Sequence, residues 1–314
     1  MHHPLFQDIV AAHERIGKFI HKTPVLTSQS INTITGAKLY FKCENFQKVG
    51  AFKFRGATNA VLSLENENAK KGVATHSSGN HAAALALAAR SARIKCYVVM
   101  PENAPRIKIE AVKGYGAEIT FCEPTLEARE STLAKVVEQT GAVFIHPYDN
   151  LQVICGQGTA AKEFLEEIPE LDIIMAPAGG GGLLSGTAIT AKSINGNIQV
   201  IAGEPANADD AYRSFKSGTL ISSVKPDTIA DGLLTSLSEL TFDIICSNVN
   251  DIITVSEISI ISAMRMIWER MKIIIEPSSA VPVAAVYENP EQFHGKKTGI
   301  ILSGGNVDLT KLPF

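Results

Sequence analysis

Lys53 is the residue of this sequence best suited to covalent chemistry, because it lies between Phe52 and Phe54 and is followed by Arg55 and Gly56. The pKa of a free lysine amine is about 10.4, and removal from water among apolar groups lowers it. A neutral lysine amine is a nucleophile that can form a Schiff base with a carbonyl cofactor or substrate. The alternative is an amphipathic lysine whose stem lies on Phe52 while its ammonium reaches water.

A second group of polar side chains follows the apolar run at residues 73–76. It consists of Ser77, Ser78, Asn80 and His81, and an alanine-rich helical pattern comes directly after it. Hydroxyl and amide groups at a helix N-terminus form an anion site, which the helix dipole strengthens. Capping by Ser78 or Asn80 is the simpler explanation, but capping needs only one such residue.

Four consecutive glycines, Gly179, Gly180, Gly181 and Gly182, follow the apolar run at residues 173–176. Glycines let several backbone N–H groups converge on a phosphate, because no Cβ is in the way. Their spacing differs from the dinucleotide fingerprint, and no lysine stands where a P-loop needs one. A small monophosphate is therefore the expected ligand, and a glycine-rich turn without a ligand is the alternative.

Two other strand ends carry oxygen-bearing groups. One runs into Ser303, whose hydroxyl lies beside glycine-rich backbone, although these residues also suit a simple turn. The other is followed by Glu204, the carbonyl of Ala208 and the carboxylate of Asp210, whose oxygens could bind Mg²⁺, Mn²⁺ or Ca²⁺. Capping of the next short helix by an aspartate is the alternative for this second group.

These groups need elements that bring them together, and the sequence predicts an α/β protein. Short β-rich runs alternate with helical patterns, which is typical of parallel βαβ units with helices on both sheet faces. The loops after strand carboxyl ends form the ligand crevice of such sheets, and the polar groups fall on those loops. No flexible linker is visible, so any second domain is woven into the first, with crossings near residues 70 and 150. The predicted strands cover residues 37–43, 73–76, 96–100, 118–122, 143–146, 173–176, 199–202, 252–255 and 299–302, and the predicted helices cover residues 5–20, 80–91, 105–113, 126–139, 157–167, 183–193, 257–270 and 278–287.

Composition limits the class of protein. The chain has 314 residues, of which 45% are hydrophobic and 19% charged, and its formal net charge is −3. These values are typical of a globular protein and predict no binding to nucleic acid or to a membrane. The five cysteines have neither C-x-x-C nor zinc-site spacing, and no secretory signal is visible, so we expect reduced thiols in a cytoplasmic protein.

Together these motifs resemble those of the fold-type II pyridoxal-phosphate enzymes, most closely serine racemase and the single-domain serine/threonine dehydratases. The similarity spans nearly the whole chain and rests on four ordered motifs: Ala51-Phe52-Lys53-Phe54-Arg55-Gly56, Ser77-Ser78-Gly79-Asn80-His81, Gly179-Gly180-Gly181-Gly182 and Ser303-Gly304-Gly305-Asn306. The resemblance implies two doubly wound parallel-sheet domains. A small mobile domain at residues 71–148 is expected within a large cofactor-binding domain at residues 1–70 and 149–314.

The resemblance also implies contacts to the cofactor, pyridoxal 5′-phosphate. Lys53 is the expected attachment point, with Phe52 beside the ring and Asn80 at the 3′-oxygen. Ser303 is expected at the pyridine nitrogen and Gly232 along the ring. The expected phosphate contacts are Gly179, Gly180, Gly181, Gly182 and the N–H of Leu183.

For the substrate, the resemblance implies that Ser77, Ser78 and His81 receive the amino-acid carboxylate. Arg129 matches a substrate-side arginine of serine racemases, although it equally suits a solvated position on a helix. Ser78 is also the racemase-type residue, because its hydroxyl could deliver a proton from the face opposite Lys53.

The implied reaction is deamination of L-serine or L-threonine by β-elimination of water, giving a 2-oxo acid and ammonia, with serine racemase activity beside it. A lyase acting on 3-hydroxyaspartate or another β-hydroxy amino acid is the alternative, and a non-catalytic sensor with the same fold is a third reading. The resemblance further implies a homodimer and a divalent cation (Mg²⁺, Mn²⁺ or Ca²⁺) at Glu204, Ala208 and Asp210.

Four positions depart from the nucleotide effector site of animal serine racemases. Gln29, Val49, Ala83 and Tyr148 replace residues that help bind ATP there. We therefore expect no activation by ATP, and a titration of the reaction rate with ATP tests this expectation.

Overall fold

The computed structural model describes residues 3–77 and 79–314, in which short strands alternate with helices. The strands lie close to their predicted positions, apart from β1, which was not predicted. They are β1 (Val25–Leu26), β2 (Lys38–Cys43), β3 (Val73–His76), β4 (Cys96–Pro101), β5 (Glu118–Cys122), β6 (Val143–Phe144), β7 (Ile173–Pro177), β8 (Gln199–Pro205), β9 (Asp251–Val255) and β10 (Lys297–Leu302).

The helices include every predicted one and several shorter ones. The α-helices are α1 (Phe6–Ile16), α2 (Gln29–Thr35), α3 (Lys53–Leu62), α4 (Asn66–Lys71), α5 (Asn80–Ala92), α6 (Arg106–Gly114), α7 (Leu126–Thr140), α8 (Leu151–Glu167), α9 (Gly182–Ile194), α10 (Asp210–Ser217), α11 (Glu239–Asn248), α12 (Glu257–Met271), α13 (Pro277–Glu288) and α14 (Pro290–Phe293). The 3₁₀ turns are η1 (Glu44–Phe46), η2 (Lys48–Gly50), η3 (Ala206–Ala208) and η4 (Asp231–Leu233).

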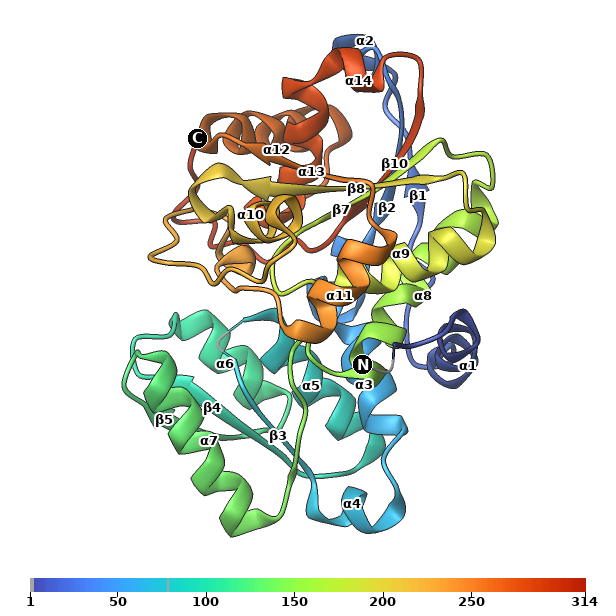
Figure 1. The fold of residues 1–314 in the computed structure, drawn as a ribbon. Coiled ribbons are helices and arrows are strands. Elements are labelled where there is room, and N and C mark those ends of the chain that lie inside the picture. Colours follow the sequence, from blue (N-terminus) through green and yellow to red (C-terminus); the bar gives the residue numbers. More distant parts are fainter. Residues whose placement is uncertain (1–2, 78) are drawn as a thin grey trace.

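The strands form two sheets, one in the upper and one in the lower part of the molecule (Figure 1). The six-stranded sheet has the order β1-β2-β10-β7-β8-β9, and the four-stranded sheet has the order β5-β4-β3-β6. All pairs are parallel except β1 with β2, which is antiparallel. The smaller sheet takes its strands from one continuous stretch of chain, whereas the domain bounds at residues 70 and 148 stay a prediction.

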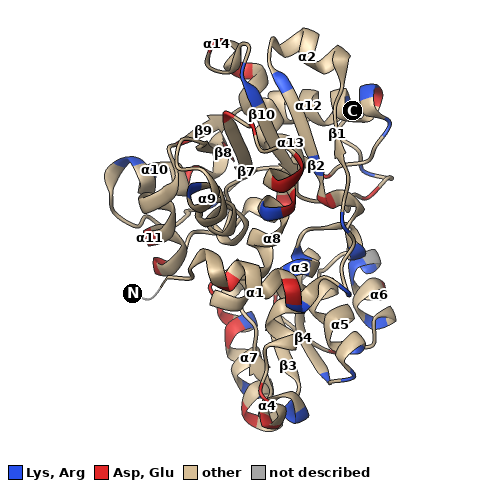
Figure 2. Cartoon of the chain, turned by 90° about the vertical axis from the view of Figure 1, so that its right-hand side faces the viewer, with Lys and Arg blue, Asp and Glu red and all other residues tan. Residues whose placement is uncertain are grey.

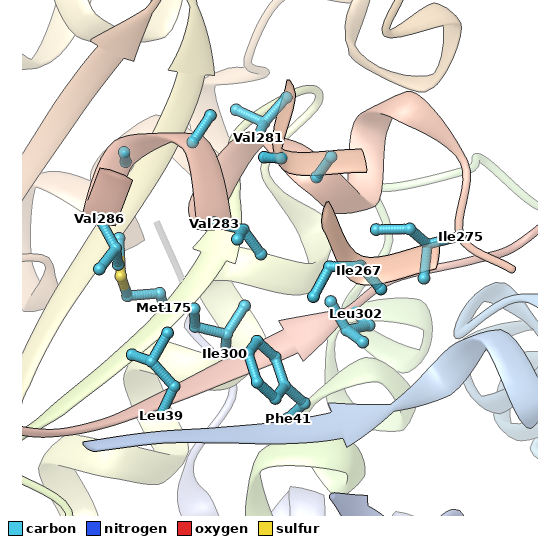
Figure 3. Close-up of a cluster of buried hydrophobic side chains, with 14 of the residues drawn as sticks. Leu39, Phe41, Met175, Ile267, Ile275, Val281, Val283, Val286, Ile300 and Leu302 are labelled. Atoms are coloured by element: carbon cyan, nitrogen blue, oxygen red, sulfur yellow. The ribbon is translucent and has the colours of Figure 1, made fainter. Parts of the chain in front are cut away.

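Helices cover both faces of the six-stranded sheet. On one face, Leu39, Phe41, Met175 and Ile300 point from the strands toward α12 and α13, where they meet side chains such as Val283 (Figure 3). The opposite face packs against α8 and α9 in a second buried cluster. This arrangement confirms the predicted α/β architecture, in which parallel strands are buried on both faces.

Helices α3, α8 and α9 cross so closely that their backbones touch at glycines. A Cβ added to Gly156 of α8 would lie 2.6 Å from the Cα of Gly56 in α3, and one added to Gly158 would lie 2.9 Å from the carbonyl oxygen of Gly186 in α9. These glycines allow the close approach of α3 to α8 and of α8 to α9.

Two differences from the predicted elements have local causes. Helix α8 begins at Leu151 rather than near residue 157, because the side chain of Asn150 accepts a hydrogen bond from the N–H of Val153 and caps an earlier start. Glycines in the first turns of α8 weaken its helical signal. Strand β1 has only two residues, which is too short for a periodic pattern to show.

Within the described ranges, no helix is long and apolar enough to cross a membrane. All five cysteines, which lie in the same ranges, are free thiols, and burial raises the pKa of Cys43, Cys96 and Cys155 to about 12. Basic and acidic residues are distributed over both halves of the ribbon (Figure 2).

Candidate active site

Lys53 is the first residue of α3 and lies at the junction of the two sheets. Its Nζ donates a hydrogen bond to the carbonyl oxygen of Pro147 at 2.9 Å and lies 5.1 Å from the ring centroid of Phe52. Burial lowers the pKa of Lys53 to about 8, against the opposing effect of the Glu276 carboxylate. Phe54 does not share this position, because it packs into the apolar core beneath α5. Lys53 therefore has the desolvated amine that the sequence predicts, with one of the two phenylalanines beside it.

The tetraglycine loop, residues 179–182, joins β7 to α9 and is buried. Its backbone N–H groups, together with those of Leu183 and Leu184, donate no hydrogen bond to any residue that the structure describes. Buried N–H groups without acceptors are rare, and a helix N-terminus that presents them is an anion site. Gly181 has a φ of 84°, in the left-handed region that favours glycine. The loop therefore fits the predicted phosphate.

Tyr148 covers one side of the tetraglycine loop. A Cβ added to Gly180 would overlap the Tyr148 ring, and one added to Gly182 would lie 3.0 Å from the Cβ of Tyr148. The glycines are thus needed for the close approach of this ring as well as for a phosphate. Because Tyr148 lies in the same crossing segment as Pro147, that segment contacts both the loop and the Lys53 amine.

Ser303 lies at the carboxyl end of β10, next to the start of the Lys53 helix. Its carbonyl oxygen accepts a hydrogen bond from the N–H of Phe52 at 2.9 Å, and its buried Oγ lies 3.0 Å from the Oγ of Ser279. Gly232 approaches from η4, where its carbonyl oxygen would lie 3.2 Å from a Cβ on Gly179. Contacts therefore link these groups in two sets: Lys53 with Phe52 and, through the Phe52 N–H, Ser303, and Gly232 with the tetraglycine loop.

The side chain of Asn80, at the start of α5, is held by Glu276 and Asn306. Its Nδ2 donates to the two Glu276 carboxylate oxygens at 3.0 and 3.1 Å, and its Oδ1 accepts from the Nδ2 of Asn306 at 2.8 Å. Burial raises the pKa of Glu276 to about 7, and Asp231 adds to this effect. These bonds fix the orientation of the Asn80 amide.

Three histidines lie near Lys53 on the side of the small sheet. His81 is buried with its Nε2 3.1 Å from the carbonyl oxygen of Ile145, and burial, followed by the charge of Lys53, lowers its pKa to about 3. His146 accepts a hydrogen bond at Nδ1 from the N–H of Asp149, and burial lowers its pKa to about 4. Its ring lies 6.3 Å from that of His76, centroid to centroid. No carboxylate of a described residue forms an ion pair with these three rings.

The remaining predicted substrate residues differ in their placement. The Oγ of Ser77 accepts a hydrogen bond from the N–H of Gly79 at 3.2 Å, which shapes the turn before α5. Ser78 lies outside the described residues. Arg129 is half-buried on α7, where its Nε donates to the Thr125 carbonyl oxygen at 3.3 Å. Burial lowers the pKa of His76, and the charge of Arg129 lowers it further, so Arg129 belongs to the His76 side of the site.

The residues of the predicted cation site lie together at the start of α10. The two carboxylate oxygens of Glu204 accept hydrogen bonds from the N–H groups of Ala211 and Tyr212 at 2.9 and 2.7 Å, so Glu204 caps this helix. Burial raises the pKa of Glu204 to about 8, and burial also raises the pKa of Asp210, whose Oδ2 has no partner among the described residues. Glu204 already accepts two hydrogen bonds, whereas the buried Oδ2 of Asp210 without a described partner suits a cation. The described residues nevertheless hold no group of three or more His, Cys, Asp or Glu side chains that could bind a metal ion.

A cavity of about 690 Å³ opens beside Asn80 and Asn306. Of the four positions that depart from the effector site of animal serine racemases, Val49 and Ala83 line this cavity, whereas Gln29 begins α2 and Tyr148 covers the tetraglycine loop. Whether all four belong to one effector site stays a prediction. The expected lack of ATP activation stays a prediction.

Several site residues were missed by sequence reasoning. Pro147 contributes only a backbone carbonyl, which no side-chain pattern reveals. Glu276 could have been found as an acidic residue directly before Pro277 at a helix start. No sequence pattern indicates that Tyr148 contacts the tetraglycine loop, because this contact arises only in the tertiary structure.

The fold, the desolvated lysine amine and the glycine loop with N–H groups that have no described acceptor are typical of enzymes that use a phosphate-bearing carbonyl cofactor. Residues 16–304 match the family described as pyridoxal-phosphate dependent enzyme, and the chain belongs to this family. It is 57% identical over 310 residues to a serine racemase of Dictyostelium discoideum, covering 98% of this chain and 96% of the relative. It is 53% identical over 314 residues to a beta-hydroxyaspartate dehydratase of Paracoccus denitrificans (strain Pd 1222), with all of both chains covered.

Solved structures agree with the family. The crystal structure of the Dictyostelium discoideum serine racemase superimposes with a TM-score of 0.93 and covers 97% of this chain and 99% of that one. A T.th. threonine deaminase has a TM-score of 0.94 at 41% identity, covering 98% of this chain and all of that one. The likeness confirms the fold that the motifs predicted.

The residues present fit pyridoxal phosphate. The Lys53 amine is desolvated, the tetraglycine loop and the N-terminus of α9 offer N–H groups without acceptors, and the hydroxyl of Ser303 is buried at the strand end between them. The amine suits the aldehyde of the cofactor, the N–H groups suit its phosphate, and the hydroxyl suits its ring nitrogen. The protein is therefore a pyridoxal-phosphate enzyme, and the role of each residue is a proposal.

Proposed function

We propose that this protein eliminates water from L-serine or L-threonine, giving a 2-oxo acid and ammonia, and that it also racemises serine. The observation that carries the proposal is the desolvated amine of Lys53 on Pro147, next in the chain to Tyr148, which covers a tetraglycine loop whose N–H groups have no acceptor among the described residues. The 57% identity to a serine racemase supports the choice of substrate.

Bound pyridoxal phosphate supplies a carbonyl for the substrate amine and an electron sink for negative charge at the substrate Cα. Lys53 suits the general base that takes the Cα proton, since an amine with a pKa of about 8 exchanges protons near neutral pH. Ser303 can offer a pyridine nitrogen only a neutral hydroxyl, which does not hold a proton there as a carboxylate would. This difference favours elimination over reactions that need a long-lived carbanion.

Dehydration of 3-hydroxyaspartate is the second candidate, and a specific observation favours it. His76, His146 and Arg129 lie on the small-sheet side of the site, and none of them forms an ion pair with a carboxylate of a described residue, although the charges of Glu130 and Asp149 act on His76 and His146. With Nδ1 of His146 accepting a hydrogen bond, the hydrogen of its neutral ring is on Nε2, which donates to no described residue. A second substrate carboxylate would supply an acceptor, and the Paracoccus denitrificans relative is a beta-hydroxyaspartate dehydratase.

We further propose a divalent cation at Glu204, Ala208 and Asp210, a homodimeric assembly and a cytoplasmic location. The buried acids at the start of α10 support the cation, and the free thiols are consistent with a reducing compartment. The homodimer is supported by the resemblance to serine racemases, and sedimentation analysis of the purified protein measures it directly.

A panel of amino acids tests the two candidate reactions together. Purified enzyme is incubated with L-serine, D-serine, L-threonine and 3-hydroxyaspartate stereoisomers, and ammonia, 2-oxo acid and serine enantiomers are measured. Ammonia and D-serine from L-serine support the first candidate. A kcat/KM at least about tenfold higher for a 3-hydroxyaspartate isomer, equal to about 1.4 kcal/mol of transition-state discrimination, supports the second. Absence of ammonia from every substrate contradicts both.

A further inference from the structure

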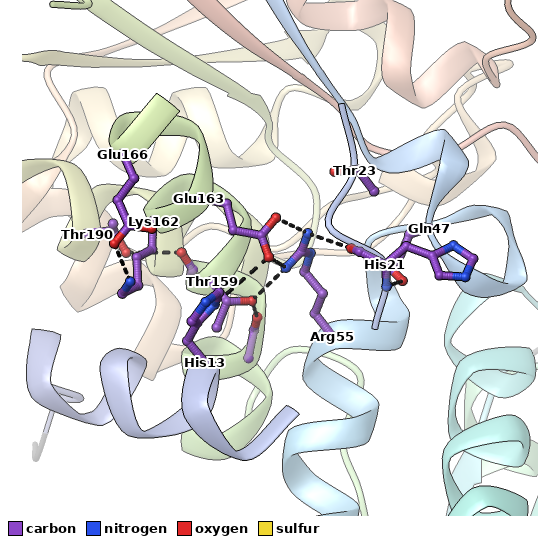
Figure 4. Close-up of polar contacts among 12 residues, drawn as sticks. His13, His21, Thr23, Gln47, Arg55, Thr159, Lys162, Glu163, Glu166 and Thr190 are labelled. Carbon is purple, nitrogen blue, oxygen red and sulfur yellow. Dashed lines mark hydrogen bonds and ion pairs between the residues drawn. The ribbon is translucent and has the colours of Figure 1, made fainter. Parts of the chain in front are cut away.

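Behind Lys53 lies a buried cluster of four charged side chains, Lys42, Glu44, Arg55 and Glu163, each 0–3% exposed. Their formal charges cancel. Arg55 is at the centre: its Nε donates to Glu44 at 2.7 Å, its Nη1 to Glu163 at 2.8 Å, and its Nη2 to Glu44 and Glu163 at 2.9 and 2.7 Å. Figure 4 shows Arg55 reaching from α3 toward Glu163 on α8.

Hydrogen bonds from the other residues of the cluster connect further elements of the fold. Lys42 at the end of β2 donates to Glu163 at 2.7 Å and to the Thr23 carbonyl oxygen at 2.7 Å. The Thr23 hydroxyl in turn donates to Glu44 at 2.6 Å. The cluster therefore joins α3, α8, the end of β2 and the segment before β1.

Stability alone is a weak explanation for this cluster. Desolvation of buried charges offsets most of their attraction, and apolar side chains of similar volume often serve as well or better. A guanidinium that donates to two carboxylates at once does, however, impose a defined orientation, because its N–H groups form a rigid planar fork. The feature that needs an explanation is the orientation of α3.

Arg55 follows Lys53 by two residues, which is about 200° around a helix, so the two side chains leave α3 on opposite sides. The elements that hold Arg55 are the same ones that frame the Lys53 amine. Helix α8 carries Glu163 and follows the segment whose Pro147 carbonyl accepts from Lys53 Nζ. Glu44 follows β2, which pairs with β10, and β10 ends at Ser303 beside Phe52.

We propose that Arg55 is a positioning residue for Lys53: its fork to Glu44 and Glu163 fixes the rotation of α3 and so holds the Lys53 amine at the Pro147 carbonyl oxygen. Arg55 touches neither the cofactor nor the substrate. The inference rests on cofactor attachment at Lys53, as proposed above. A misplacement of about 1 Å in a reacting group can cost about 10²-fold in rate, so a loosened α3 has a measurable effect.

The test compares holoenzyme of Arg55→Lys and Glu163→Gln with the matched control Glu166→Gln. Glu166 lies on the same helix but pairs with Lys162 near the surface. Four quantities are measured: kcat, KM, the pH dependence of the visible absorbance of the bound cofactor, and the unfolding midpoint. Borohydride labelling followed by peptide mass spectrometry reports the fraction of Lys53 attached to the cofactor.

We expect kcat of Arg55→Lys and Glu163→Gln to fall at least about tenfold with KM within about threefold of wild type, and the pH midpoint of the absorbance to shift. Glu166→Gln should match wild type in every measurement. If one variant does not fold, Lys42→Met combined with Glu163→Gln, which keeps the cluster neutral, is judged by the same criteria.

Folded variants with wild-type kcat, absorbance midpoint and labelling overturn the inference, even if their unfolding midpoint is lower, because that pattern shows a purely structural role. Failure to label Lys53 in the wild-type protein contradicts the proposed function instead. The two failures are thereby distinguished.

Discussion

The Lys53 amine is subject to two opposing effects: burial, which lowers its pKa, and the Glu276 carboxylate, which raises it. Burial is the larger effect, so the amine can lose its proton near neutral pH and then act as a nucleophile or base. The carbonyl oxygen of Pro147 holds the amine in place without adding a charge. This balance is the residue-level basis of the proposed chemistry.

Replacement of Lys53 tests its role directly. Lys53→Ala should remove the visible absorbance of the bound cofactor and lower turnover by at least about 10³-fold, because both the attachment point and the general base are lost. Absorbance spectra and ammonia release measure the two effects. Lys48→Ala is the control, since Lys48 stacks over Phe54 away from the amine and its loss should change neither quantity. A normal cofactor spectrum in Lys53→Ala would show that the lysine is misassigned.

The predicted second-face proton donor, Ser78, is tested through product chirality. Ser78→Ala should abolish formation of D-serine from L-serine while sparing part of the deamination, because only racemisation needs a proton on the face opposite Lys53. Chiral analysis of serine beside an ammonia assay measures both. Ser91→Ala is a suitable control, since that hydroxyl bonds only within its own helix, to the Leu87 carbonyl oxygen. Equal loss, or equal survival, of the two activities counts against the assignment.

Much of the site could be predicted from local sequence motifs. Lys53, the tetraglycine loop and Ser303 each follow or precede a recognisable strand or helix, and the ends of parallel strands converge in space. Glu276 and Pro147 were missed because they meet Asn80 and Lys53 across 196 and 94 residues of chain. Arg55 was visible in its motif, but its role depends on Glu44 and Glu163, which no local pattern connects to it.

At the scale of elements, the long periodic segments were predictable and the short ones were not. The strands of the parallel sheets are apolar runs bounded by turns, so β3 and β5 have the predicted bounds. Helices α2, α10, α11 and α14 are short and are stabilised by tertiary contacts and caps more than by a periodic face. Residues Val25–Leu26 form strand β1 only because they pair with β2, and such pairing depends on the tertiary structure.

Helix α10 gives a prediction at this scale, because Glu204 both caps it and belongs to the proposed cation site. Removal of divalent cations with a chelator should lower the unfolding temperature, and re-addition of Mg²⁺, Mn²⁺ or Ca²⁺ should restore it. A cation present at about 100 times its dissociation constant contributes about 2.7 kcal/mol. Differential scanning fluorimetry of wild type and Glu204→Gln measures the effect. The variant should not respond to cations, and an equal response of both proteins would place the cation elsewhere.

For the whole molecule, the buried carboxyl of Glu276 links folding stability to pH. Its pKa rises from 4.5 in the unfolded chain to about 7 in the folded protein, so the folded state binds the proton more tightly. The stability from this group is full below about pH 4.5 and is lost as the pH rises through 7. At 1.36 kcal/mol per unit of pKa, the full loss is about 3 kcal/mol.

Glu276→Gln isolates this contribution, because the amide does not titrate. The free energy of unfolding of wild type relative to the variant should fall between pH 5 and pH 7.5, as measured by urea denaturation of cofactor-free protein at both pH values. Asp308→Asn, an exposed acid near the C-terminus, is the control and should show no such fall. A difference that is constant with pH would contradict the proposed titration.

The strand order has a consequence for biosynthesis. Strand β10 comes after the other described strands in the chain, yet it lies in the middle of the six-stranded sheet, between β2 and β7. Until it emerges, the nascent chain holds two half-sheets whose inner edges have unsatisfied N–H and C=O groups, which is the situation in which chains associate with one another. The four-stranded sheet comes from one continuous stretch and is free of this delay. Completion of the larger sheet therefore waits until β10 has been synthesised, and chaperones that shield exposed strand edges should matter most in that interval.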